Sequence, residues 1–180
     1  MSDATTTSKA APAPGPGIGF GILIVVVVGL VLWTILMSQW VTPLSLFGGY
    51  LMLWYWANLE QLSVRRLPAA LAGAMVGIGL AWALVYGPTH FGASGLVVGL
   101  LLLLVALYLD ILKAVPLLVN ASTMLYVTVA AAPLVQLKVD WIELILATLG
   151  GGLFFAGFVE AVKWIAQKAF GARPQPDRKA

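Results

Sequence analysis

Long apolar runs, each about as long as a bilayer is thick, are the feature that most constrains this chain. The first covers residues 18–37 without one charged side chain. A membrane-spanning helix needs about 20 apolar residues, with a usual range of about 17–25. The chain is 61% hydrophobic and 9% charged, whereas soluble domains carry about 25% charged residues. Because a soluble chain of this length could not bury so much apolar surface, the sequence predicts an integral membrane protein.

Proline, glycine and charged residues divide the chain into six predicted spans. These cover residues 18–37, 44–57, 68–86, 95–112, 116–134 and 141–159, and the stretch GPTHFGASG is predicted to be an outer loop. The predicted fold class is all-α, a polytopic bundle of six transmembrane helices within residues 18–170. Residues 1–17 and 171–180 are rich in polar residues or proline and are predicted to be disordered tails.

The first run has a second interpretation, a signal peptide. The run is longer than the usual apolar core of about 7–15 residues in such a peptide, which favours a retained span. The basic residues then predict the orientation. With both termini on one side, that side holds nine Lys and Arg, and the other side holds only Lys138. The positive-inside rule therefore predicts cytoplasmic termini.

A weak internal repeat relates the two halves of the chain. Pro43-Leu44 and Pro116-Leu117 each begin a predicted span and lie 73 residues apart, and the same offset pairs GIGL with GGGL. Nine identities occur over the 48 positions from 40 to 87, where about four are expected by chance in so biased a composition. Three spans in each half predict a 3+3 inverted repeat, which is typical of transporters. The alternative is ordinary proline and glycine placement for helix packing.

Several polar and aromatic side chains are candidates for a solute path: Asn120, Ser122, Gln39, Asn58, Trp54 and Tyr50. Lipid cannot satisfy a polar group, so Asn120 requires either a partner or a cavity. The alternative for Asn120 is an interhelical hydrogen bond, worth on average about 0.6 kcal/mol. The alternative for Tyr50 and Trp54, which share a helix face, is contact with lipid at the interface.

Two acidic residues are candidates for proton coupling, Asp110 and Glu160, each three positions before a lysine. The alternative is an ion pair along one helix face that anchors the helix end at the interface. Glu143 is expected to form a solvated cluster with Asp140 and Lys138.

Glycines predict close helix contacts at Gly48, Gly49, Gly73, Gly77, Gly150, Gly151 and Gly152. The chain has no cysteine and one histidine, so no disulfide, metal site or cofactor is predicted. No Ser-His-Asp or paired-carboxylate arrangement is visible, which predicts that the protein is not an enzyme.

Three stretches in order carry a family resemblance: LSLFGGYLMLWYWAN, GIGLAWALVYG and KVDWIELILATLGGGLFFAGF. They lie within residues 41–169, and in this order they resemble a small bacterial inner-membrane family catalogued as domain of unknown function 1097. The chain departs from the family pattern in lacking cysteine and in its proline-rich tail. The resemblance implies a multi-pass protein of the bacterial inner (cell) membrane, and it transfers no activity and no functional residue.

Two functions are expected from these features. The first is a channel or secondary transporter for a small polar or weakly charged solute. The alternative is a non-transporting membrane subunit or scaffold that binds partner helices through its glycine faces. The predicted partners are the lipid bilayer, a small-molecule solute and further copies of the chain in a homo-oligomer. Nucleic acid is not expected, because the net charge of +3 is small and suits anionic lipid.

Overall fold

The computed structural model describes residues 15–170, and every regular element in that range is helical. The elements are α1 (Pro16–Met37), α2 (Phe47–Asn58), the 3-10 turn η1 (Val64–Arg66), α3 (Leu67–Leu112), α4 (Ala121–Ala130), α5 (Pro133–Gln136) and α6 (Trp141–Phe170). The predicted all-α class is confirmed. Both predicted tails lie almost wholly outside the described residues. α1 begins within the first predicted tail at Pro16, whose fixed φ suits a first helical position.

Three stretches are long and apolar enough to cross a membrane: Pro16–Met37, Val64–Leu112 and Trp141–Ala169. α1 is about 33 Å long at 1.5 Å per residue, close to the roughly 30 Å hydrocarbon core of a bilayer. Its large apolar side chains are mostly exposed, and only Gly29 and Trp33 are buried. Such a surface is compatible with contact with lipid and supports the membrane-protein class.

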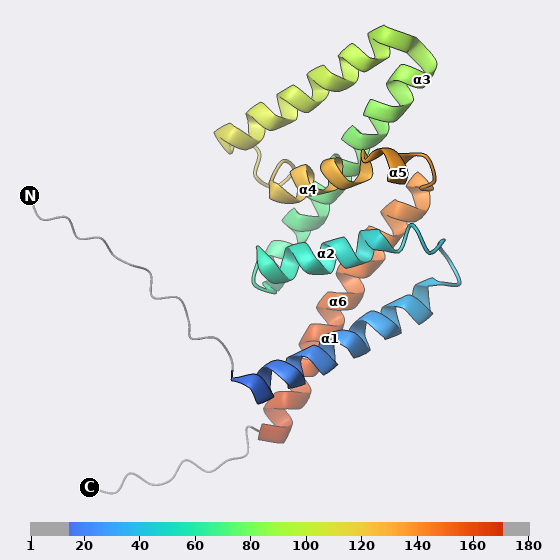
Figure 1. Ribbon diagram of the computed structural model, residues 1–180. Coiled ribbons are helices and arrows are strands. Elements are labelled where there is room, and N and C mark those ends of the chain that lie inside the picture. The colour runs from blue at the N-terminus through green and yellow to red at the C-terminus, as the bar shows by residue number, and fades with distance from the viewer. Residues whose placement is uncertain (1–14, 171–180) are drawn as a thin grey trace, which may run out of the picture.

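α3 is a hairpin of two antiparallel helical arms (Figure 1). The chain reverses at Gly92, whose φ of 59° and ψ of −138° suit glycine and strain other residues. The arms pack closely where Gly87 meets Gly95. The outer loop predicted over GPTHFGASG is therefore wrong. The helical backbone continues through Pro88 and resumes directly after Gly92, so the reversal occupies a single residue.

α2 and α4 are shorter than the spans predicted there. They measure about 18 Å and about 15 Å at 1.5 Å per residue, about half the hydrocarbon core. Each follows a non-helical lead-in segment, residues 42–46 before α2 and residues 115–120 before α4. The single helix predicted over 116–134 is wrong, because the chain there forms a lead-in segment, α4 and the start of α5. Pro43, Pro116 and Pro133 lie at these breaks, and proline cannot donate a backbone hydrogen bond.

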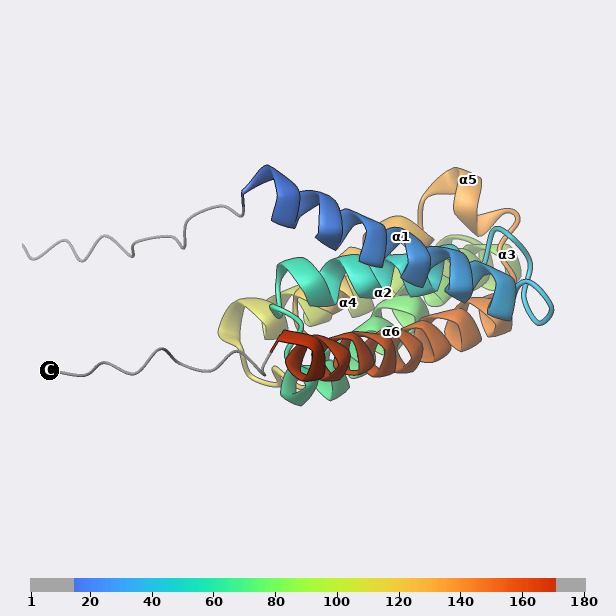
Figure 2. The same cartoon turned by 90° about the horizontal axis from the view of Figure 1, so that it is seen from below.

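α1 and the first arm of α3 run toward one end of the bundle, whereas the second arm of α3 and α6 run back toward the other (Figure 1). α2 packs mainly against α6, and α4 packs mainly against α3. The start of α1 and the ends of α3 and α6 lie at one end of the bundle, whereas α5 and the start of α6 lie at the other (Figure 2). We call the first the basic end, because it carries Arg65, Arg66, Lys113, Lys163 and Lys168. Lys138 lies at the opposite end.

Candidate functional site

The two short helices meet at a point that we call the central crossing, formed by Gly48, Tyr126 and Thr148. Tyr126 of α4 is fully buried, and its hydroxyl donates a hydrogen bond to the Gly48 carbonyl oxygen of α2 at 2.6 Å. Thr148 of α6 is also fully buried, and a Cβ on Gly48 would lie 2.5 Å from its Oγ1. The crossing therefore places two hydroxyls beside one glycine of α2.

The first lead-in segment is held by the first turn of α6. The backbone N–H and the hydroxyl of Thr42 donate to Glu143 Oε2 at 2.7 and 2.6 Å. Ser45, fully buried, lies with its hydroxyl 3.1 Å from that of Thr42. Asp140 instead caps α6, because its Oδ1 accepts the N–H groups of Ile142 and Glu143. The two carboxylates thus have separate structural partners at an exposed end of the bundle.

The second lead-in segment is held by the first turn of α3. Asn120 is the N-cap of α4, with its Oδ1 accepting the Ser122 N–H at 2.9 Å in a capping box with Thr123. Its Nδ2 donates to the Ala69 carbonyl at 2.9 Å and to a carbonyl of its own lead-in segment at 3.1 Å. The hydroxyl of Ser122 donates to the Ala70 carbonyl at 2.8 Å. Asn120 therefore lies at the start of α4, whereas the sequence predicted it one turn inside a span. Its polar side-chain atoms both have protein partners.

The two anchors occupy corresponding positions in the chain. Ala69, which accepts from Asn120, and Ala70, which accepts from Ser122 of α4, lie 74 and 73 residues before Glu143, close to the offset that separates Pro43 from Pro116. Each lead-in segment is bound to the first turn of a long helix from the other half of the chain. The bonding groups differ: a carboxylate holds the first lead-in segment, and backbone carbonyls hold the second.

The remaining polar candidates do not converge on the central crossing. Gln39 is exposed in the turn after α1, at the end of the bundle opposite the basic end. Asp110 and Glu160, the candidates for proton coupling, lie toward the basic end. Their carboxylates pair with Lys113 and Lys163 at 2.9 and 2.7 Å.

Tyr50, Trp54 and Asn58 line a common groove of about 630 Å³, which we call the α2 groove. The remaining lining residues are apolar: Val26, Leu30, Leu53, Ala57, Leu62 and Val159. The Tyr50 hydroxyl lies 2.6 Å from the Thr34 hydroxyl, and Asn58 Nδ2 donates to the Trp54 carbonyl at 2.8 Å. The Tyr50 hydroxyl and the Asn58 amide nitrogen thus have protein partners, and most of the remaining wall is hydrocarbon.

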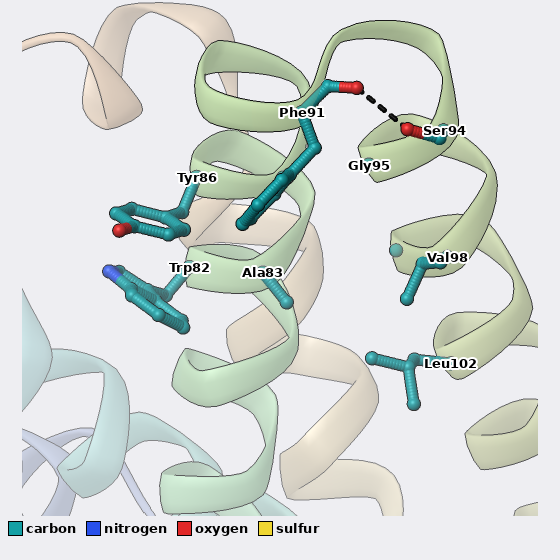
Figure 3. Close-up of a pocket in the computed structure, with 10 residues that line it drawn as sticks. Trp82, Ala83, Tyr86, Phe91, Ser94, Gly95, Val98 and Leu102 are labelled. Atoms are coloured by element: carbon teal, nitrogen blue, oxygen red, sulfur yellow. Dashed lines mark hydrogen bonds between the residues drawn. The ribbon is translucent and has the colours of Figure 1, made fainter.

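Another cavity, of about 400 Å³, lies between the two arms of α3. Figure 3 shows the aliphatic side chains that face the gap, Ala83, Val98 and Leu102. Trp82 and Tyr86 project from the other side of the first arm and stack with ring centroids 4.6 Å apart. The Ser94 hydroxyl, at the top of the gap, donates to the Phe91 carbonyl at 2.7 Å. This cavity therefore offers little to orient a polar solute.

The seven glycines predicted to pack helices all lie at close contacts. A Cβ on Gly77 would lie 2.5 Å from the Thr123 carbonyl oxygen, and Gly151 would meet the Cα of Gly49. Gly73 faces the Asn120 amide. The remaining contacts are made by Gly48 with Thr148, Gly49 and Gly150 with Trp33, and Gly152 with Leu71. The glycine faces thus bring α2, α3, α4 and α6 together around the central crossing.

Sequence reasoning missed Tyr126, Thr148 and the bond between Thr42 and Glu143. Tyr126 carried a weak signal, because a tyrosine within an apolar helix usually needs a partner for its hydroxyl. Nothing in the sequence identified that partner as a backbone carbonyl 78 residues away.

The described residues thus form a helical bundle of the kind that membrane proteins use. No family model, no curated protein and no solved structure matches the chain. The resemblance to domain of unknown function 1097 stays a prediction.

Proposed function

We propose that this chain is a six-span transporter of the inverted-repeat class, which passes a small polar or weakly charged solute across the bacterial inner membrane. The observation that carries the proposal is the reciprocal anchoring of the lead-in segments, one by Glu143 and the other by Ala69 and Ala70. Inverted repeats in transporters place broken helices from both halves around a central site. The 73-residue offset between the anchors fits such a repeat.

In this proposal, α1, the two arms of α3 and α6 provide four spans. Each short helix, together with its lead-in segment, provides one more. Non-helical backbone at membrane depth must be satisfied by protein or by water in a cavity. Thr42 and Asn120 supply such bonds for the two lead-in segments. The basic end then lies in the cytoplasm together with both termini, as the positive-inside rule requires.

The central crossing is the gate of the proposed path. Tyr126 fills the space between α2 and α4, and a single hydrogen bond to Gly48 holds it there. Separation of the two helices breaks that bond and exposes the hydroxyls of Ser45 and Thr148. Both are uncharged, and among the described residues no carboxylate is fully buried. These features favour facilitated passage of a neutral or weakly charged solute over proton-coupled transport.

Stopped-flow uptake into proteoliposomes tests the gate, with urea, formate, acetate, glycerol and ammonia as the panel. Wild-type protein is compared with Tyr126→Phe and with Tyr108→Phe, a matched control on an exposed tyrosine of α3. We expect uptake of one solute above protein-free vesicles, and about fivefold faster uptake in Tyr126→Phe, because a net hydrogen bond is worth about 1 kcal/mol. The absence of uptake for all five solutes in all three proteins contradicts the proposal.

A second experiment uses the absence of cysteine from the chain. Thr148→Cys introduces a single thiol at the central crossing, and Gln39→Cys introduces an exposed control. We expect slow labelling of position 148 by a membrane-impermeant thiol reagent, and faster labelling when Tyr126→Phe is added. Equal labelling rates with and without Tyr126→Phe would place Thr148 outside the path.

One observation favours the alternative function, a subunit that binds partner helices. α1 leaves nearly all of its apolar side chains exposed, including Ile18, Phe20 and Ile35. Crosslinking in membranes, followed by purification in mild detergent, tests this reading. A fixed partner on α1, combined with no uptake of any solute, would favour the subunit over the transporter.

A further inference from the structure

We propose that the α2 groove binds one acyl chain of an anionic phospholipid from the leaflet at the basic end. The inference rests on the proposed membrane topology but not on transport. The groove lies between α1, α2 and α6, and along α2 it extends from Tyr50 to Asn58, toward the basic end. Its volume of about 630 Å³ is within the usual range for a small-molecule site, about 300–1,000 Å³.

The chemistry of the wall favours hydrocarbon. Of the polar groups in the wall, the Tyr50 hydroxyl is bonded to Thr34 and the Asn58 amide nitrogen to the Trp54 carbonyl, which leaves the Trp54 indole N–H and the Asn58 amide oxygen. A polar solute would therefore find few free partners and would lose its hydration without compensation. An acyl chain has no hydrogen bonds to lose on contact with this wall. The groove is accessible to lipid, because α1 is exposed over most of its surface.

The charge beside the groove selects the headgroup. Leu62 lines the groove, and Arg65 and Arg66 follow it in η1, both exposed. Arg66 lies 4.0 Å from Glu60, whereas Arg65 has no ion pair within the described residues. Lys163 lies one helical turn beyond the lining residue Val159 and pairs with Glu160. The excess of positive charge here suits a phosphate at the membrane surface.

A corresponding groove in the second half provides an internal comparison. Leu30 lines the α2 groove, and Leu103, 73 residues later, lines a smaller groove of about 250 Å³ against α4. Ala131, directly after α4, lines the smaller groove. The six residues that follow Ala131 include no lysine or arginine. The two grooves thus share their position in the repeat but differ in size and in charge, and only the α2 groove has the features of a lipid site.

Native mass spectrometry of the full chain in detergent tests the site, with phosphatidylglycerol and phosphatidylcholine of identical acyl chains as probes. We expect wild-type protein to bind one phosphatidylglycerol at least fivefold more tightly than phosphatidylcholine. Arg65→Gln with Arg66→Gln should weaken phosphatidylglycerol by about fivefold for each charge removed and leave phosphatidylcholine unchanged. Lys138→Gln, at the opposite end, should change neither.

Filling the groove tests the position of the acyl chain. Ala57→Phe should remove the bound lipid, whereas the matched Ala131→Phe in the smaller groove should retain it. Circular dichroism checks that both variants are folded, and Leu53→Phe replaces Ala57→Phe if that variant is not. Equal affinity of wild type for the two lipids, or unchanged binding after the groove is filled, overturns the inference. Because lipid binding is measured without solute uptake, a failure of the lipid inference can be told apart from a failure of the transport proposal.

Discussion

The hydroxyl of Tyr126 donates a hydrogen bond to the carbonyl oxygen of Gly48, which joins the short helices of the two halves across 78 residues of sequence. Tyr126→Phe keeps the ring and removes the donor. We expect it to lower the free energy of unfolding by about 1 kcal/mol, because the buried hydrogen bond between the two short helices is lost. Unfolding in denaturing detergent, followed by circular dichroism, measures the change. Tyr108→Phe, on an exposed tyrosine, should leave stability within error.

Asn120 has two separable roles, the cap of α4 and the bond to the Ala69 carbonyl. Asn120→Ser keeps a capping oxygen and removes the amide donor that bonds the Ala69 and Pro116 carbonyls, so we expect a loss of about 0.6 kcal/mol for the interhelical bond. Asn120→Leu removes both and should lower stability by about 1 kcal/mol more. Equal losses for the two variants, measured by the same unfolding assay, would show that the cap contributes nothing.

Gly77 and Gly79 provide a matched pair within α3. A Cβ on Gly77 would lie 2.5 Å from the Thr123 carbonyl oxygen, whereas one on Gly79 would meet nothing within 4 Å. We expect Gly77→Ala to destabilise the protein by about 1–3 kcal/mol through overpacking. Gly79→Ala should be neutral or stabilising by up to about 1 kcal/mol, because alanine favours the helix. The melting temperatures of the purified variants give the comparison, and similar shifts for both would contradict the close contact.

The bond from Thr42 to Glu143 should couple the first lead-in segment to α6. Glu143→Gln keeps an acceptor oxygen and should be milder than Glu143→Ala. A double-mutant cycle of Glu143→Ala with Thr42→Val should show a coupling energy, because both changes remove the same contact. Strictly additive effects on the unfolding midpoint would mean that the side-chain bond does not hold the segment.

Six spans with the basic end in the cytoplasm predict a definite labelling pattern. Single cysteines at Gln39→Cys and Lys138→Cys should react with an impermeant reagent added outside intact cells. Arg65→Cys and Lys113→Cys should react only after the membrane is opened. Outside labelling at position 65 or 113 would require another number of crossings.

The sequence predicted the long helices well, because each depends on local features. α1 ends at Met37 and α6 begins at Trp141, as predicted, because an uninterrupted apolar run marks each helix. α6 continues to Phe170, beyond its predicted end at residue 159. The lead-in segments were missed because proline at a span start resembles an ordinary first helical turn. The capping box of Asn120 with Thr123 was visible in the sequence and could have placed the start of α4 correctly.

The arrangement of the site required information that local patterns do not contain. Ser122 and Asn120 bond to the first turn of α3, about 50 residues earlier in the chain. Whether a polar residue in an apolar run meets another helix, water or a ligand depends on which helices become neighbours. The periodicity of the chain does not determine this.

The reciprocal anchoring also has a consequence for biogenesis. Chains are synthesised from the N-terminus, and segments assemble as they emerge. α4 finds its main partner, α3, already in place, but α2 must wait for α6, the last helix within residues 15–170. Until then, Thr42 lacks the Glu143 carboxylate and the glycine face of α2 is uncovered. A chain that stalls before Trp141 therefore carries a first half whose α2 lacks its main packing partner.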